Sequence, residues 1–212
     1  VYFGRLEQRK GLLLFLEALE QLPTAPAEVV FVGGDCRIAE GRWGSELVQE
    51  RLGQLGIRFR IETGLERDQA LQRLRELAGV VVIPSLIENS PCVVEELLNS
   101  GLRLVTTGVG GTPELVNAAS QPWLSAPEPA ALAGHLAQAL QPVEPGAYQL
   151  EARLPGWQIA LSWQAFHERL PRRQAQPTEA QANEQASTSA VRRSLRLAKR
   201  VARKLVNLAR NR

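Results

Sequence analysis

The chain has 212 residues, of which 44% are hydrophobic and 22% charged, a balance that is ordinary for one globular domain with additional segments. It contains neither a run of about 20 apolar residues nor a signal-peptide pattern, so the sequence predicts no membrane-spanning helix and no secretion. The two cysteines, Cys36 and Cys92, have no disulfide or metal-binding spacing and indicate reduced thiols in a cytoplasmic protein.

The net charge of +3 comes from the end of the chain. Of the 25 lysines and arginines, nine lie within residues 191–212, which contain no acidic residue. Residues 1–190 therefore carry 16 basic and 22 acidic side chains, a net charge of −6. The net positive charge of the whole chain therefore gives no information about the globular part.

Strands and helices alternate along the first 140 residues. Short apolar runs that end in glycine or proline predict strands, and apolar residues at spacings of three and four predict helices. This alternation is typical of an α/β fold with a doubly wound, mainly parallel Rossmann-like sheet covered on both faces. The predicted strands span residues 1–3, 28–32, 57–61, 80–83 and 104–107, and the predicted helices span 12–22, 45–55, 68–78 and 127–140, with two more that begin near Pro91 and at Thr112.

The pattern changes after this domain, which we expect to span residues 1–145. A helical extension is predicted over residues 146–171, with Ser162 as an N-cap for the second half of its helix. Residues 172–190 are rich in Gln, Ala, Ser and Thr and predict a disordered linker. Residues 191–212 regain helical periodicity, with an apolar stripe opposite the basic residues, and predict a basic amphipathic helix.

Three segments could bind phosphate or hydroxyl groups where strands give way to helices. Arg5 and Lys10, in the loop that follows the first strand, form a pair of cations that suits a diphosphate. The alternative is a solvated polar loop.

A pair of carboxylates follows the strand at residues 80–83. Glu88 lies in the loop after this strand, and Glu96 lies about a turn and a half into the next helix, where it could accept hydrogen bonds from vicinal hydroxyls. The alternative is two surface glutamates at a chance spacing. In the third segment, Gly110 and Gly111 precede a helix N-terminus and would allow close backbone approach to an anion. The alternative there is a plain turn.

Together these segments are more specific than any one of them. GRLEQRKG, VVIPSLIENSPCVVEELLNSG and LVTTGVGGTPELV occur in this order and in these strand-to-helix contexts. They resemble the C-terminal, nucleotide-sugar-binding domain of family-four retaining glycosyltransferases of the GT-B fold, over about residues 1–140. Glu88 and Glu96 match the signature of this family, a glutamate, seven residues and a second glutamate.

The resemblance implies a role for each matching residue. Arg5 and Lys10 would hold the donor diphosphate and stabilise the charge on the departing nucleoside diphosphate, which is electrostatic catalysis at the leaving group. Glu88 would lie near the hydroxyls of the donor sugar, and Glu96 would bind the ribose. The family needs no metal ion or other cofactor. Amides around Cys92 and Val93 would approach the sugar and phosphate, and Gly64 and Leu65 would line the nucleobase.

Two departures from the family pattern bear on these expectations. Asn89, Ser90 and Pro91 replace the glycine-rich sequence that usually follows the first glutamate, and Pro91 has no N–H to donate. A GT-B enzyme also needs an N-terminal domain for its acceptor. Because the chain has no Met and begins at Val1 within a strand pattern, we expect that domain upstream, and we expect this half alone to bind a donor weakly and to transfer nothing.

The resulting hypothesis is the donor-binding half of a retaining glycosyltransferase that transfers a sugar from a nucleotide-diphosphate sugar to a glycan or lipid acceptor. The alternative is a non-catalytic sugar-nucleotide-binding or interaction module. A dinucleotide-dependent oxidoreductase is excluded because Pro113 stands where the last glycine of G-x-G-x-x-G belongs. The basic helix at residues 191–212 could contact an anionic membrane surface or a neighbouring domain, in preference to nucleic acid. We therefore expect a cytoplasmic protein, with peripheral attachment to the membrane as one option.

Overall fold

The computed structural model describes residues 1–141 and 150–170. The predicted linker at residues 172–190 and the predicted basic helix at 191–212 lie outside this part. The compact unit that holds the sheet spans Val1–Gln164. The strands are β1 (Tyr2–Phe3), β2 (Val29–Val32), β3 (Phe59–Glu62), β4 (Val81–Ile83) and β5 (Leu104–Thr106), and the helices are α1 (Leu12–Glu20), α2 (Gly44–Leu55), α3 (Arg67–Leu77), α4 (Cys92–Leu98), α5 (Thr112–Leu115), α6 (Pro129–Leu140) and α7 (Gly156–Arg169), with single 3-10 turns at Gln8–Lys10, Ala39–Gly41 and Gln121–Trp123.

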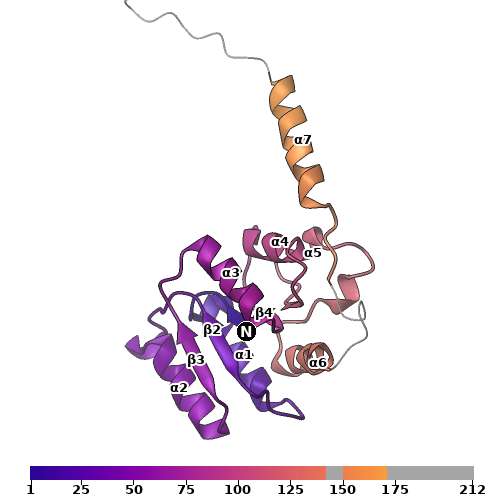
Figure 1. Ribbon diagram of the computed structural model, residues 1–212. Helices are drawn as coiled ribbons and strands as arrows, with labels where there is room; N and C mark the ends of the chain where they lie inside the picture. Colours follow the sequence, from indigo (N-terminus) through magenta and orange to yellow (C-terminus); the bar gives the residue numbers. More distant parts are fainter. Residues whose placement is uncertain (142–149, 171–212) are drawn as a thin grey trace, which may run out of the picture. The chain divides into compact units, whose positions relative to one another are not determined.

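The five strands form one parallel sheet in the order β3-β2-β1-β4-β5 (Figure 1). The first strand is the central one, and Tyr2 pairs with Phe31 on one side and Val82 on the other. From β1 the chain builds outward in one direction through β2 and β3, and then in the other through β4 and β5. The predicted doubly wound α/β fold is therefore confirmed.

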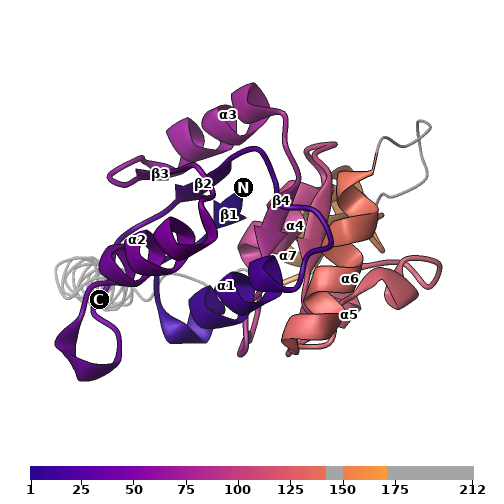
Figure 2. The ribbon, with the colours of Figure 1, turned by 90° about the horizontal axis from the view of Figure 1, so that it is seen from below.

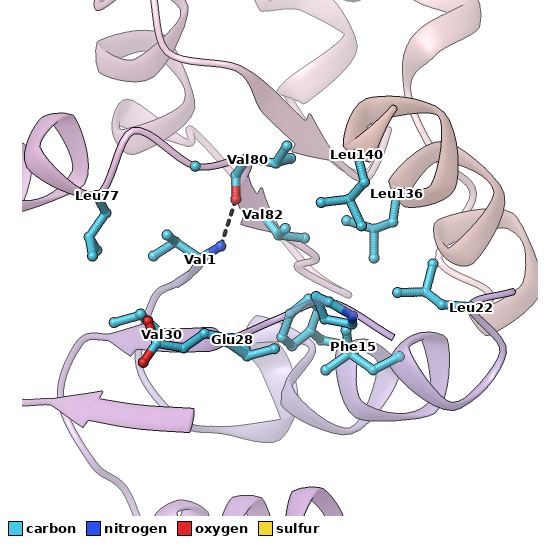
Figure 3. Close-up of a pocket in the computed structure, with 14 residues that line it drawn as sticks. Val1, Phe15, Leu22, Glu28, Val30, Leu77, Val80, Val82, Leu136 and Leu140 are labelled. Atoms are coloured by element: carbon cyan, nitrogen blue, oxygen red, sulfur yellow. Dashed lines mark hydrogen bonds between the residues drawn. The ribbon is translucent and has the colours of Figure 1, made fainter. Parts of the chain in front are cut away.

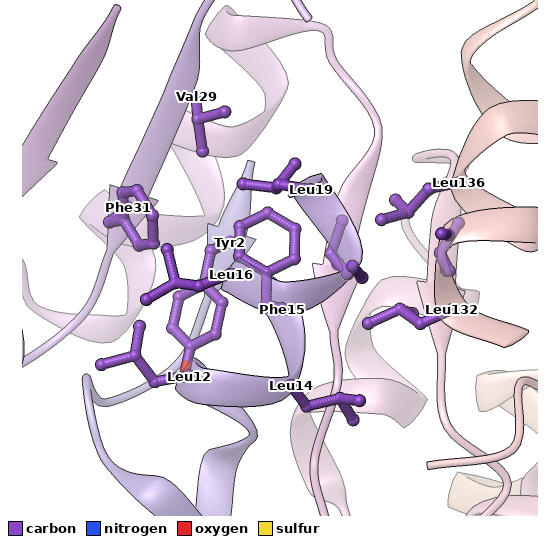
Figure 4. Close-up of a cluster of buried hydrophobic side chains, with 14 of the residues drawn as sticks. Tyr2, Leu12, Leu14, Phe15, Leu16, Leu19, Val29, Phe31, Leu132 and Leu136 are labelled. Atoms are coloured by element: carbon purple, nitrogen blue, oxygen red, sulfur yellow. The ribbon is translucent and has the colours of Figure 1, made fainter. Parts of the chain in front are cut away.

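One face of the sheet is covered by α1, α2 and α6 (Figure 2). Alternate strand residues point to this face because successive side chains of a strand lie on opposite sides. Tyr2, Phe15 and Phe31 meet at its centre, with ring centroids 5.5 to 5.9 Å apart, and leucines of α1 and α6 surround them (Figure 4). This cluster fixes β1 and α1, the two elements that flank the first loop.

The opposite face is covered by α3 and α4. Val30 and Val32 of β2 and Val81 and Ile83 of β4 point to it and are buried against both helices. The helix side chains in this layer are Ala70, Leu74, Val94 and Leu97. Because strands β2 and β4 are buried on both faces, their sequences are continuously apolar.

The third strand begins two residues later than its alternating pattern predicts. Gly56 ends α2 in the left-handed conformation, with φ 65°, and Ile57 donates its N–H to the carbonyl of Leu52 at 3.1 Å. This is the Schellman arrangement, in which the residue after the glycine also makes an apolar contact with the helix. Ile57 is accordingly buried as part of the helix end, and β3 starts at Phe59.

Helix α7 is continuous from Gly156 to Arg169, so the predicted cap at Ser162 is wrong. The Ser162 hydroxyl donates to the carbonyl of Gln158 at 2.8 Å, the back-bond that a serine inside a helix makes. Within residues 1–141 and 150–170, no helix is long and apolar enough to cross a membrane.

Candidate functional site

The carboxyl ends of β1 and β4 mark the position where the order of the sheet reverses. The chain leaves β1 toward one side of the sheet and leaves β4 toward the other, and open α/β sheets bind ligands outside the strand ends at such a switch point. An open pocket of about 390 Å³ lies there, and glycines 33 and 34 after β2 also line it. Five residues predicted for the site line this pocket: Arg5, Lys10, Glu88, Cys92 and Val93.

Hydrogen bonds from Tyr2 anchor the loop after β1. The Tyr2 hydroxyl, on a fully buried side chain, lies 2.8 Å from the carbonyl oxygen of Arg5 and 3.1 Å from that of Lys10, and it donates to this pair. Burial raises the pKa of the phenol, with smaller contributions from Glu7 and Cys36, so the hydroxyl keeps its proton and remains a donor. One hydrogen-bond donor therefore anchors the backbone of Arg5 and Lys10, the two residues whose cations line the pocket.

Replacement of Tyr2 by phenylalanine should test this anchor. We expect the free energy of unfolding to fall by about 1–2 kcal/mol, because two partly buried carbonyl groups lose their donor while the ring remains. Urea denaturation of the wild type and Tyr2→Phe measures the change. Unchanged stability would show that the hydroxyl does not hold the loop.

The same loop is locked against the loop after β4. Gly11 has the left-handed φ of 74°, and a Cβ at this position would lie 1.8 Å from the carbonyl oxygen of Pro84. Leu86 donates its N–H to the carbonyl of Arg9 at 2.9 Å. The loops from the two strands are thus one packed unit, and it places Lys10 beside Glu88.

Lys10 and Glu88 form a salt bridge at the centre of the pocket. The Glu88 side chain is only 8% exposed, and its Oε1 also accepts a hydrogen bond of 2.7 Å from the hydroxyl of Ser85. Ser85 is fixed in turn, since its carbonyl accepts a hydrogen bond of 2.5 Å from the hydroxyl of Thr107 at the end of β5. The carboxylate is therefore held in one orientation by elements from three strands.

The pKa of Glu88 reflects these contacts. Desolvation raises it, but the hydrogen bonds from Lys10 and Ser85 outweigh this effect and lower the pKa of the carboxyl below its usual 4.5. A depressed carboxyl pKa contributes stability that is present above the unfolded pKa and is lost as pH falls through the folded pKa.

A comparison of Glu88→Gln with the wild type tests this effect. We expect the stability difference between the two proteins to be largest near pH 7 and to shrink progressively as pH falls below 4.5. Thermal unfolding at several pH values measures it. A difference that stays constant from pH 7 to pH 3 would contradict the proposed charge pairing.

Arg5 is held by a neighbour in its own loop. Its Nη2 lies 3.1 Å from Oε1 of Glu7, and the same oxygen accepts a hydrogen bond of 3.1 Å from Arg9. Three cations thus share two carboxylates around this edge of the sheet, Glu7 and Glu88. The remaining excess of positive charge suits an anionic ligand.

Helix α4 begins at the wall of the pocket. Pro91 takes the N-cap position, which needs no N–H from it. The N–H of Cys92 donates to the carbonyl of Ser90 at 2.9 Å, whereas the N–H of Val93 has no acceptor within the described part of the chain. Of the two predicted amides, the one that remains available to a ligand is that of Val93.

Gly110 and Gly111 lie outside the lining of the pocket and pack against the backbone of the loop that holds Glu88. Gly110 has a φ of 56°, and a Cβ there would lie 1.6 Å from the carbonyl oxygen of Glu88. A Cβ at Gly111 would lie 2.5 Å from the carbonyl oxygen of Asn89. The close approach that these glycines allow is to the backbone of the Glu88 loop.

Glu96, Gly64 and Leu65 also lie outside the lining of this pocket. Glu96 is 27% exposed and follows Cys92 by four residues, so both lie on one face of α4 and Glu96 is one turn further from the pocket. Its Oε1 accepts hydrogen bonds from Arg67, the first residue of α3, at 2.9 and 2.6 Å. Gly64 and Leu65 are exposed in the loop that precedes α3.

Several residues that shape the site carry no signal of that role in the sequence. Tyr2 follows the alternation of its strand, which predicts burial but not a contact for its hydroxyl. Ser85 and Thr107 end two strands that are adjacent in the sheet, and knowledge of the strand order would have placed them together. Arg67 pairs with a residue 29 positions away, and no local pattern marks it.

A second pocket, of about 170 Å³, lies at the opposite, amino edge of the sheet (Figure 3). Apolar side chains of α1, β2, β4 and α6 line most of it, and the amino group of Val1 donates to the carbonyl of Val80 at 2.6 Å there. Glu28 is its one charged side chain among the described residues. The described lining of this pocket contains no lysine or arginine for a phosphate ligand.

Comparison with known proteins identifies a family and several relatives. The family described as glycosyl transferases group 1 matches residues 1–142. An uncharacterized glycosyltransferase of Methanocaldococcus jannaschii is 30% identical over 119 residues, which cover 55% of this chain and 28% of that protein. The lipopolysaccharide 1,2-N-acetylglucosaminetransferase of Salmonella typhimurium is 29% identical over 121 residues, which cover 55% and 32%. The chain therefore spans less than a third of the length of either relative.

Solved structures share the fold. Sucrose-phosphate synthase from Thermosynechococcus elongatus superposes with a TM-score of 0.52 at 25% identity, over 66% of this chain and 36% of that one. A trehalose-phosphate synthase from Burkholderia xenovorans superposes with a TM-score of 0.51 at 20% identity, over 67% and 35%. Three observations lead to one assignment. The sheet is doubly wound, charged loops lie at its switch point, and the family match covers the whole sheet. The chain belongs to the group 1 glycosyl transferases.

Proposed function

We propose that this chain is the donor-binding half of a retaining glycosyltransferase of family four, the C-terminal domain of a GT-B fold. The observation that carries the proposal is the pocket at the β1/β4 switch point, where Arg5 and Lys10 flank a carboxylate held in a fixed orientation. Paired cations suit the diphosphate, and a fixed carboxylate suits the hydroxyls of a sugar attached to it.

In this proposal the charges act on the leaving group. Arg5 and Lys10 neutralise the negative charge that develops on the departing nucleoside diphosphate, without a divalent metal. Lys10 shares its ammonium between the diphosphate and Glu88, which keeps the carboxylate ionised and directed at the donor sugar. The Val93 amide approaches the sugar or phosphate at the start of α4.

The flank of the pocket takes the nucleoside. Glu96 accepts hydrogen bonds from the ribose, and Gly64 and Leu65 pack beside the base. Gly110 and Gly111 support the Glu88 loop from below. The acceptor, a glycan or lipid, binds to a part of the protein outside these 212 residues, which is consistent with the greater length of the curated relatives. Transfer on the cytoplasmic side, with residues 191–212 against an anionic membrane surface or a neighbouring domain, is part of the same proposal.

Titration of nucleotides into the chain tests the donor site. We expect UDP or GDP to bind at least about tenfold more tightly than UMP or GMP, ~1.4 kcal/mol, because the second phosphate reaches the second cation. Isothermal titration calorimetry measures the four affinities. Equal affinities for the mono- and diphosphate of both bases would refute a diphosphate site.

The alternative, a binding module without transfer chemistry, predicts the same nucleotide affinities. Glu88→Gln in the longer protein separates the two functions, because the change should reduce the turnover of a nucleotide sugar far more than it reduces UDP or GDP affinity. A wild-type protein that binds the nucleotide but turns over no donor would favour the module.

A further inference from the structure

We propose that Arg67 is a positioning residue for donor recognition, and that it holds the Glu96 carboxylate so that one of its oxygens faces the ribose hydroxyls. The inference rests on the proposed function and adds a residue outside the segments that resemble family four. The observation that carries it is the geometry of one ion pair between α3 and α4.

Three of the five N–H groups of the Arg67 guanidinium donate to carboxylates. Its Nε and Nη2 donate to the same oxygen of Glu96, Oε1, at 2.9 and 2.6 Å, and its Nη1 donates to Asp68 at 3.0 Å. The pair of bonds to one oxygen fixes the orientation of the Glu96 carboxylate. Glu96 Oε2, in contrast, receives no hydrogen bond from the described residues. This carboxylate oxygen is available to accept from a hydroxyl, which is the group that a ribose presents.

The position of the pair suits this task. Helices α3 and α4 cover the same face of the sheet, where Ala70, Leu74, Val94 and Leu97 belong to one buried cluster, and Arg67 stands one turn before Ala70 at the start of α3. The start of α3 lies at the same edge of the sheet as the pocket, because parallel strands all end there. Glu96 is one turn of α4 behind Cys92 in the wall of the pocket. A nucleoside that extends from the Lys10 pocket toward the loop at residues 64–66 would pass Glu96.

The pair also joins two segments that would contact one nucleoside. Arg67 follows directly on the loop at residues 64–66, whose last residue, Glu66, donates its N–H to Oε1 of the Gln69 side chain at 3.0 Å, as a helix cap. Arg67 therefore links the capped loop to the carboxylate of Glu96, which would bind the ribose. Because the Arg67 side chain is 66% exposed, its contribution to folding is small, and its loss should alter binding without unfolding the protein.

The test compares UDP and GDP with their 2′,3′-dideoxy counterparts in the 212-residue chain. In the wild type we expect the better-binding ribonucleotide to have about tenfold higher affinity than its dideoxy form. This is the effect of losing a hydrogen bond to a charged group. Arg67→Ala should reduce this ratio to less than about threefold, with little change in dideoxy affinity, and Arg67→Lys should fall between. In a Glu96→Gln background, Arg67→Ala should have no further effect, because Arg67 acts only through that carboxylate.

Arg73→Ala is the matched control. Arg73 lies six residues further along the same helix and makes a similar two-nitrogen pair with Glu62, at 2.8 and 2.9 Å. It should leave the ribose ratio unchanged. An unchanged ratio in Arg67→Ala, or tighter binding that shows Arg67 to compete with the ribose, overturns this inference alone, provided that UDP or GDP binding still depends on Lys10. Absence of UDP and GDP binding to the wild type overturns the donor site as well.

Discussion

Replacing Lys10 by alanine is expected to weaken UDP or GDP binding by at least about tenfold, ~1.4 kcal/mol. The change removes the more buried of the two cations that line the pocket, since the Lys10 side chain is 23% exposed and that of Arg5 is 55% exposed. It also leaves the Glu88 carboxylate beside the diphosphate without its counter-charge, and like charges repel. Calorimetric titration of UDP and GDP measures the loss.

Two further variants separate the binding effect from a folding effect. Arg9→Ala removes a neighbouring cation that does not line the pocket, and we expect it to change the affinity less than Lys10→Ala does. The double variant Lys10→Ala, Glu88→Gln removes the unpaired carboxylate and should regain stability relative to Lys10→Ala without regaining affinity. Affinity that returns together with stability would show that Lys10 acts on the fold and not on the phosphate.

Replacing Gly110 by alanine is expected to lower the free energy of unfolding by about 3 kcal/mol, through left-handed strain and overpacking together. The Cβ would lie 1.6 Å from the carbonyl oxygen of Glu88, a distance that only a movement of the Glu88 loop can relieve. Because that movement separates the carboxylate from Lys10, nucleotide binding should weaken as well. Chemical denaturation and UDP or GDP titration measure the two effects.

Gly56→Ala supplies the control for backbone strain alone. Gly56 has a φ of 65°, close to that of Gly110, but nothing lies within 4 Å of the Cβ that alanine would add. We expect a loss of about 1–2 kcal/mol and unchanged nucleotide affinity. Equal destabilisation by the two substitutions would mean that the contact with Glu88 costs nothing.

The fold and the centre of the site were predictable because both depend on patterns that repeat along the chain. Each strand ends in a loop at one edge of a parallel sheet, so residues that follow strands, such as Lys10 and Glu88, must converge there. The boundaries were less predictable. Ile57 belongs to an apolar alternation, yet its backbone completes the end of α2, and only the left-handed glycine before it signals this.

The contacts around the site were not predictable in the same way. A glycine that permits close approach does not reveal what approaches it, and Gly110 proves to face the carbonyl of Glu88. The Arg67–Glu96 pair depends on the placement of α3 and α4 on the same face of the sheet, which a single sequence does not contain. Likewise, the alternation of β1 predicts that Tyr2 is buried but not that its hydroxyl reaches the carbonyls of Arg5 and Lys10.

The most direct test of the donor site is a map of amide chemical shifts of the isotope-labelled chain during titration with UDP and GDP. We expect the largest changes in residues 4–11, in residues 88–96 and in the loop at 64–67. Residues around the pocket at the amino edge, such as Leu22 and Leu136, should not change. Changes centred on that amino-edge pocket, or none at saturating nucleotide, would contradict a donor site at the β1/β4 switch point.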